Sequence, residues 1–260
     1  MDLAYTFSGF AVGLLIGLTG VGGGSLMTPI LIFGFKIPPI IAVGTDLLFA
    51  AITKASGTLS HSRLGNIDWK IVGLLALGSI PTTSLTLYLM NKSTSAGMEV
   101  DTLIHVSLGI ALILTSMVLI FKHKVYVFGN KIKSLIPHWR RLRSPATVLA
   151  GIMLGILVPV SSIGAGAIGA AILLFMYPSL PTSRIVGTDL AHAVPLTAVA
   201  GLGHLQMGSV DLMLLGALLL GSLPGIYLGS HISTVIPEKI MRPILASMLM
   251  LIGMKFIIVS

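Results

Sequence analysis

The chain has 260 residues and a formal net charge of +8, yet only 9% of its residues are charged and 55% are hydrophobic. So few charges cannot cover the surface of a soluble domain of this length, and the composition therefore predicts an integral membrane protein. The absence of cysteine excludes a disulfide framework, a thiolate zinc site and a cysteine nucleophile.

Eight apolar segments follow one another, four in each half of the chain. They cover residues 3–33, 38–60, 69–90, 102–121, 146–177, 182–202, 210–231 and 240–259. We therefore expect an all-α polytopic membrane protein with one transmembrane repeat in residues 1–121 and a second in residues 146–260. Residues 122–145 hold seven of the 16 lysines and arginines. This is typical of a cytoplasmic loop and does not indicate nucleic-acid binding.

The first segment of each half is about 30 residues long, or about 45 Å as a helix. The run Gly20–Ser25 interrupts the first one, and the run Ser161–Ala167 interrupts the second. Small residues in such runs either allow close helix packing or mark a broken, re-entrant helix whose backbone lines a cavity. We expect a break, more clearly in the first half. The candidate substrate-binding residues at the two breaks are Gly22, Gly23, Gly24, Ser25, Ser161, Ser162, Gly164 and Gly166.

Residues 38–81 repeat at residues 181–224 without a gap, 143 positions later. The shared positions in the first copy are Pro38, Gly44, Thr45, Asp46, His61, Gly65, Asp68, Gly78, Ser79 and Pro81. Shared Asp, His and Pro at identical spacing indicate a duplicated unit. In a membrane protein this pattern predicts a transporter with its site between the two halves.

The distribution of basic residues indicates how the two halves are oriented. If every segment crosses once, Arg184, Lys239 and Arg242 lie on the side opposite the basic loop. If each first segment turns back on itself, the halves are inverted, and these residues join Arg63 and Lys70 on the side of that loop. The positive-inside rule favours the inverted arrangement.

Asp46 and Asp189 each lie eight residues past a proline suited to the first turn of a helix. Eight residues span about 12 Å of helix, so both carboxyl groups are expected well below the membrane surface. A charge at that depth is costly and marks a functional site, here one that could bind and release protons. Alternatively, Gly-Thr-Asp marks a late helix start with an N-cap, which inside a membrane is itself an anion site.

Two residues break the repeat inside apolar runs. Lys54 stands where the second half has Thr197, and it could pair with a carboxylate, extend to the interface or bind an anion. His192 stands where the first half has Phe49, on the same helical face as Asp189. It serves either in a proton relay or as a packing residue.

Thr45 and Thr188 place hydroxyl groups beside the two acids and are candidate substrate contacts. A hydroxyl in a membrane helix also commonly bonds the carbonyl four residues earlier. Asp68 and Asp211 precede the next helices and are expected to act as N-caps.

His61 and His204 lie near helix ends, where the helix dipole favours them, and we interpret them as mainly structural. Pro81 and Pro224 follow Gly-Ser-x within helices, so each site is expected to be a hinge or a fixed bend.

Together these motifs resemble the TauE/SafE family of membrane anion exporters. The resemblance rests on the run Gly20–Ser25, the paired Val-Gly-Thr-Asp motifs, the His-x3-Gly-x2-Asp turns and the Gly-Ser-x-Pro sites, and it covers nearly the whole chain. It implies a gradient-driven secondary transporter of a bacterial or archaeal cytoplasmic membrane that moves sulfite, organosulfonates such as sulfoacetate, or related small anions. The run Ser161–Gly166 departs from the glycine-rich pattern of the family.

We therefore expect an alternating-access exporter of a small sulfur-containing anion, without a cofactor, in which Asp46 and Asp189 couple transport to protons. The alternatives are a small-anion channel and an intramembrane aspartyl protease that uses the two acids as a dyad. Symmetry that extends to His, Gly and Pro positions disfavours the protease. The sequence leaves the particular anion, the direction of transport and the oligomeric state open.

Overall fold

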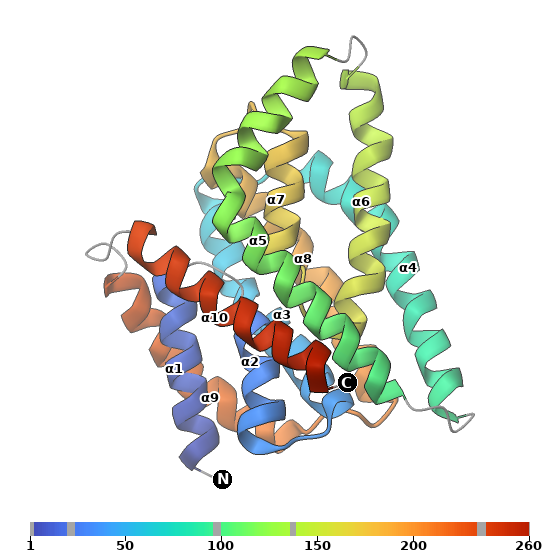
Figure 1. Cartoon of the computed structure of the whole chain (residues 1–260), viewed down its shortest axis with the longest axis vertical. Helices are drawn as coiled ribbons and strands as arrows, with labels where there is room; N and C mark the ends of the chain where they lie inside the picture. The colour runs from blue at the N-terminus through green and yellow to red at the C-terminus, as the bar shows by residue number, and fades with distance from the viewer. Residues whose placement is uncertain (1–2, 20–23, 96–99, 136–138, 233–237, 260) are drawn as a thin grey trace.

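The computed structural model describes residues 3–19, 24–95, 100–135, 139–232 and 238–259, and within these ranges all regular structure is helical (Figure 1). The elements are α1 (Leu3–Thr19), α2 (Gly24–Pro29), the π-helical turn η1 (Ile30–Gly34), α3 (Pro39–Arg63), α4 (Trp69–Ser95), α5 (Val100–Leu135), α6 (Trp139–Ser161), α7 (Ala167–Met176), α8 (Thr182–Gln206), α9 (Leu212–Ile232) and α10 (Glu238–Val259). Six of them, α3, α4, α5, α6, α8 and α9, are long and apolar enough to cross a membrane. The prediction of an all-α polytopic membrane protein is confirmed.

Both long first segments are divided into two helices, as the sequence predicts. In the first half α1 ends at Thr19 and α2 begins at Gly24, so the predicted Gly22 and Gly23 lie outside the described residues. In the second half, the turn between α6 and α7 holds Gly164 and Gly166 at φ values of 122° and 139°. Side chains other than glycine rarely adopt such values, so these glycines allow the chain to turn.

The two ends of each divided segment lie close together. The ring of Tyr5 in α1 is 4.7 Å from the ring of Phe35, which follows η1. In the second half, the hydroxyl of Thr147 in α6 is 2.8 Å from the hydroxyl of Tyr177, which follows α7. Each divided segment is therefore a helical hairpin that returns to the end from which it started.

The main helix contacts join the two halves (Figure 1). The first helix of each half packs along the third long helix of the other half, so that α1 lies along α9 and α6 lies along α4. The helices α3 and α8 pack on each other, as do α5 and α10. Each half therefore completes the other, and neither forms a separate bundle.

Small residues bring α1 and α9 into close contact. A glycine occurs at every fourth position on both facing surfaces, and a Cβ atom on any of them would meet a backbone carbonyl of the partner helix. These residues are Gly9, Gly13 and Gly17 in α1 and Gly221, Gly225 and Gly229 in α9. In membranes, where apolar burial favours helix association little, such close backbone contact is a main source of stability.

The basic stretch predicted as a loop at residues 122–145 is largely helical, because α5 continues to Leu135 and α6 begins at Trp139. The ring of Phe175, at the end of α7, is 5.9 Å from that of Phe128 and 6.3 Å from that of Trp139. The helix was predicted to end where the run of apolar residues ends. Lysine and arginine, however, are good helix formers, and aromatic contacts support this extension.

Candidate functional site

The two predicted acids lie in the interior of the molecule, on the central helices α3 and α8. Asp46 is 0% exposed and Asp189 is 2% exposed. The two helices begin at Pro39 and Thr182, each directly after a proline. Both acids are therefore well inside their helices, and the alternative that Gly-Thr-Asp marks a late helix start is wrong.

Asp46 is held by a residue from the first hairpin. The hydroxyl of Thr28 in α2 donates a hydrogen bond of 2.5 Å to Asp46 Oδ2, whereas Oδ1 has no partner among the described residues. Sequence reasoning missed Thr28, although it is a hydroxyl residue just after the glycine run. The second half has Ala170 and Ala171 at the related positions, so the two acids differ in their surroundings.

Asp189 lies directly against the backbone of the second hairpin. A Cβ atom added to Gly169, in the first turn of α7, would overlap Asp189 Oδ1. That oxygen has no hydrogen-bond partner among the described residues. Glycine at position 169 therefore allows the carboxyl group to approach the start of α7, a requirement that the repeat pattern does not reveal.

Lys54 is buried near both acids and does not extend to the membrane interface. It is 5% exposed, and its Nζ donates a hydrogen bond of 2.5 Å to the carbonyl of Ala165 in the turn between α6 and α7. Its ammonium group also interacts electrostatically with both Asp46 and Asp189. The residue that breaks the repeat thus joins α3, the second hairpin and both acids.

His192 lies on α8 and is 0% exposed. Its Nε2 is 2.8 Å from the hydroxyl of Ser79 in α4, which belongs to the Gly-Ser-x-Pro site. Its Nδ1 has no partner within the described part of the chain. Sequence reasoning assigned Ser79 only to a bend, because its histidine partner lies 113 residues later in the chain.

The two serines at the second break have different environments. Ser161 donates a hydrogen bond of 2.7 Å to the carbonyl of Leu157, four residues earlier, and accepts one of 3.2 Å from the amide of Ile163. Ser162 has a φ of 56° and is 1% exposed, and its hydroxyl has no partner among the described residues. The hydroxyl of Ser162 lies close enough to Asp46 to act on its carboxyl group, whereas Ser161 stabilises the turn. In the first half, Ser25 is buried within α2.

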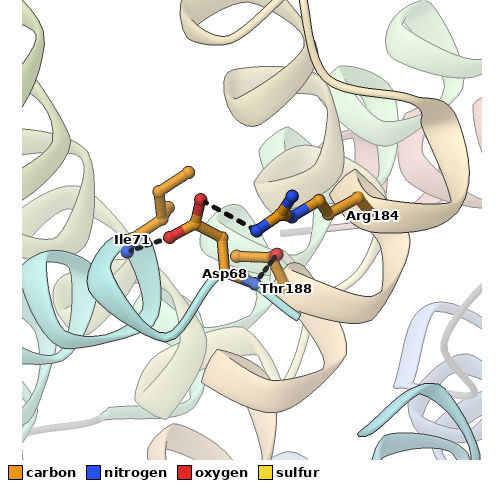
Figure 2. Close-up of polar contacts among 4 residues, drawn as sticks. All are labelled: Asp68, Ile71, Arg184 and Thr188. Carbon is orange, nitrogen blue, oxygen red and sulfur yellow. Dashed lines mark hydrogen bonds and ion pairs between the residues drawn. The ribbon is translucent and has the colours of Figure 1, made fainter. Parts of the chain in front are cut away.

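Thr45 and Thr188 join the halves reciprocally. The hydroxyl of Thr45 accepts a hydrogen bond of 3.1 Å from the amide of Asp211, and that of Thr188 accepts one of 2.9 Å from the amide of Asp68 (Figure 2). Each Gly-Thr pair packs against the turn that follows the central helix of the opposite half. Both hydroxyls thus have a partner across the junction, which the spacing alone does not reveal.

The predicted N-cap roles of Asp68 and Asp211 are confirmed. Asp68 Oδ1 accepts a hydrogen bond of 3.3 Å from the amide of Ile71, and Asp211 Oδ1 accepts one of 2.9 Å from the amide of Leu214. Asp68 also forms an ion pair with Arg184, with an Nη2–Oδ2 distance of 3.8 Å (Figure 2). Since these two side chains are 26% and 42% exposed, the pair contributes little to stability.

The central groups form one polar cluster at the junction of α3, α8 and the turn of the second hairpin. Its side chains are those of Asp46, Lys54, Ser162, Asp189 and His192. Four of them have an atom without a hydrogen-bond partner among the described residues, and leaving such groups unpaired is costly. In the same part of the chain, no group of three or more acids and histidines could hold a metal ion. The polar atoms without partners in this cluster can bind protons, water or a small polar ligand.

Comparisons with known proteins match the chain over nearly its whole length. A family model described as "Sulfite exporter TauE/SafE" matches residues 5–256. The probable membrane transporter protein YjnA of Bacillus subtilis (strain 168) is 38% identical over 99% of this chain and 100% of its own length.

Two further relatives match somewhat less of the chain, at lower identity. The probable membrane transporter protein YdhB of Bacillus subtilis (strain 168) is 29% identical over 93% of this chain and 97% of its own length. The probable membrane transporter protein MJ0441 of Methanocaldococcus jannaschii is 27% identical over 95% of this chain and 91% of its own length. No solved structure matches the chain.

Proposed function

The chain belongs to the TauE/SafE family and is a multi-pass membrane transporter, and from this premise we propose that it exports a small sulfur-containing anion such as sulfite or sulfoacetate. Its family and relatives are transporters and not enzymes, so the aspartyl protease alternative is abandoned. The anion is carried by alternating access and is coupled to protons.

The observation that carries this proposal is the buried position of Lys54. Its ammonium group donates to a backbone carbonyl at the turn before α7 and lies within electrostatic reach of two acids. A sulfur-bound oxyanion that enters the cluster replaces the carbonyl of Ala165 as the acceptor. The hydroxyl of Ser162, which lies near Asp46, adds a further donor.

Charge balance supports proton coupling. Two carboxylates and one ammonium group leave one excess negative charge in a buried site, and an arriving anion adds at least one more. Uncompensated charge is expensive in such surroundings. A proton on Asp46 or Asp189 offsets each added negative charge, so protonation favours anion binding and deprotonation favours release.

The hairpins support an inverted orientation of the two halves. Because each hairpin returns to its starting side, each half crosses the membrane three times, through α3, α4 and α5 or through α8, α9 and α10. In this arrangement α6, although long enough to span, is one arm of a hairpin, and α10 crosses with a shorter apolar segment, Pro243–Ile258. This arrangement places Arg63, Lys70 and Arg184 on the same side as the basic extension of α5, in agreement with the positive-inside rule. Alternating access then consists of movements of inverted units around a fixed site.

Flux into proteoliposomes tests the proposal. Sulfite and sulfoacetate are offered with and without an imposed pH gradient, and we expect saturable uptake that the gradient drives uphill. A channel gives downhill flux only. The Asp46→Asn/Asp189→Asn variant is expected to lose gradient-driven uptake, with Asp211→Asn as a control carboxylate outside the cluster. Full gradient-driven flux in the double variant would falsify the coupling role.

A further inference from the structure

The two central helices are covered to different extents towards their C-terminal ends. Ile52 in α3 is 45% exposed, and its repeat-related residue in α8, Pro195, is half-buried. His61 near the end of α3 is half-buried, whereas its counterpart His204 is 0% exposed. The pseudo-symmetric halves therefore adopt non-equivalent conformations, closed over the end of α8 and more open at the end of α3.

The end of α8 is closed by the helix pair α4–α6. His204 Nε2 donates a hydrogen bond of 2.9 Å to the carbonyl of Pro159, in the last turn of α6, where carbonyls lack helical partners. Because Pro159 has no amide proton, the carbonyl of Gly155 is also free, and Thr83 and Thr86 in α4 each donate to it at 3.3 Å. Carbonyls of α6 that have no partner within their own helix thus accept hydrogen bonds from α4 and α8, and these bonds hold the three helices together.

For the corresponding pair at the end of α3, α1–α9, the described residues show no bond from the end of α3 like that of His204. The ring Nδ1 of His61 has no partner among the described residues. Ser222, the counterpart of Ser79, donates to the carbonyl of Leu219 in its own helix, and Phe49 replaces the histidine that Ser79 bonds. In addition, α4 packs along α8, whereas α9 has much less contact with α3.

The contacts of the first helices identify the missing acceptor. Gly9 and Gly13 in α1 each contact one position of α9. Gly151 and Gly155 in α6, which lie 142 residues later in the chain, contact the repeat-related positions of α4. By this register the counterpart of Pro159 is Gly17. Since the described part of α1 extends to Thr19, the carbonyl of Gly17, like that of Pro159, lies close to the C-terminal end of its helix.

We propose that His204 and His61 are alternating latches of the transport cycle. In the conformation described, His204 bonds the carbonyl of Pro159 and holds α4–α6 against α8. In the opposite conformation this bond breaks, α1–α9 closes over the end of α3, and His61 bonds the carbonyl of Gly17. The inference rests on the proposed alternating access and assigns positioning roles to two residues that lie outside the polar cluster.

Amide hydrogen exchange of the full-length protein in nanodiscs tests the latches. In the wild type, residues 56–63 are expected to exchange faster than residues 199–206. In His204→Ala, exchange at residues 199–206 is expected to rise about fivefold, as the loss of one hydrogen bond implies. Exchange at residues 56–63 is expected to fall, because the second latch becomes populated. The His204→Gln variant, which keeps a side-chain donor, is expected to retain the wild-type pattern.

The matched variant His61→Ala removes the latch that is open in the structure. It is expected to leave residues 199–206 as protected as in the wild type, or more so. If amide exchange in His204→Ala rises at both residues 56–63 and residues 199–206, or changes at neither, the proposal is overturned. If His204→Ala does not fold, Thr83→Val/Thr86→Val weakens the same closure. This double variant is expected to raise amide exchange at residues 199–206 and to lower it at residues 56–63. Because exchange is measured without an anion, a wrong substrate assignment affects only the flux assay.

Discussion

At the scale of single residues, the exceptions to the repeat define the site. Lys54 and His192 each occur once, and both are buried in the central cluster. Thr28 and Gly169 add to this asymmetry, because each contacts only one of the two acids. The two carboxyl groups are related by the repeat but lie in different environments, so they can take different parts in one cycle.

Lys54 is predicted to be the main determinant of anion binding. Lys54→Met removes the buried cation and is expected to reduce anion flux by about 100-fold, since hydrogen bonds to charged groups contribute up to about 3 kcal/mol. Lys54→Arg should retain part of the activity. The repeat-related control is Thr197→Val, because Thr197 bonds only carbonyls of its own helix, and it should keep nearly full flux. Equal losses in the two variants would contradict the assignment.

Gly169 is predicted to position Asp189. In Gly169→Ala the new methyl group overlaps the carboxyl oxygen, so Asp189 must move away from the start of α7. We expect a loss of about 1–3 kcal/mol in stability, as for other overpacked sites, together with weaker gradient coupling in the flux assay. Gly73→Ala is the control, because a Cβ there meets open space. Unchanged coupling in Gly169→Ala would show that the carboxyl position is unimportant.

At the scale of helices, the two pairs that flank the centre share close glycine contacts but differ in their hydrogen bonds. Six glycines bring the backbones of α1 and α9 together, and Gly78, Gly151 and Gly155 do the same for α4 and α6, where threonine hydroxyls also bond a carbonyl freed by a proline. Glycine contacts depend on close fit and cannot accommodate added atoms. We therefore expect the pair α1–α9 to move as one unit.

Substitution within the glycine contact is expected to separate α1 from α9. Gly13→Leu places a side chain where the backbone of Ser222 lies, and it should lower the free energy of unfolding by about 1–3 kcal/mol or more. Thermal unfolding in detergent and flux in liposomes measure the effect. Gly216→Ala, on α9 but facing open space, is the matched control and should be neutral or slightly stabilising. Similar destabilisation by both would contradict this role for the contact.

At the scale of the whole molecule, hairpins and charge make the same topological prediction. The proposed three crossings in each half would place the N- and C-terminal ends of the chain on the side opposite the basic connection between α5 and α6. Alkaline phosphatase fused after residue 260 is therefore expected to be active and a green fluorescent protein fused there dark. A fluorescent protein inserted between α5 and α6 should be bright. The opposite pattern at residue 260 would exclude the inverted orientation.

Much of this could be predicted from the sequence. Apolar length and glycine runs depend on local chemistry, so the helices and both breaks were predictable, as was the burial of Asp46 and Asp189. Hydrogen-bond partners that lie on different helices were not predictable. The bonds of Ser79 with His192 and of Thr28 with Asp46 depend on which helices meet, and periodicity within one helix carries no record of that. The N-cap role of Asp68 was predictable because its acceptor oxygen serves its own helix.

The reciprocal threonine bonds also constrain the order of events during synthesis. The amide of Asp68 finds the hydroxyl of Thr188 only after 120 more residues have left the ribosome. Until then the first half resides in the bilayer with this junction unformed and with the face of α3 that receives α8 uncovered. Insertion of the helices and assembly of the transporter are therefore separate steps. The first half reaches its final packing only when the second half contacts it.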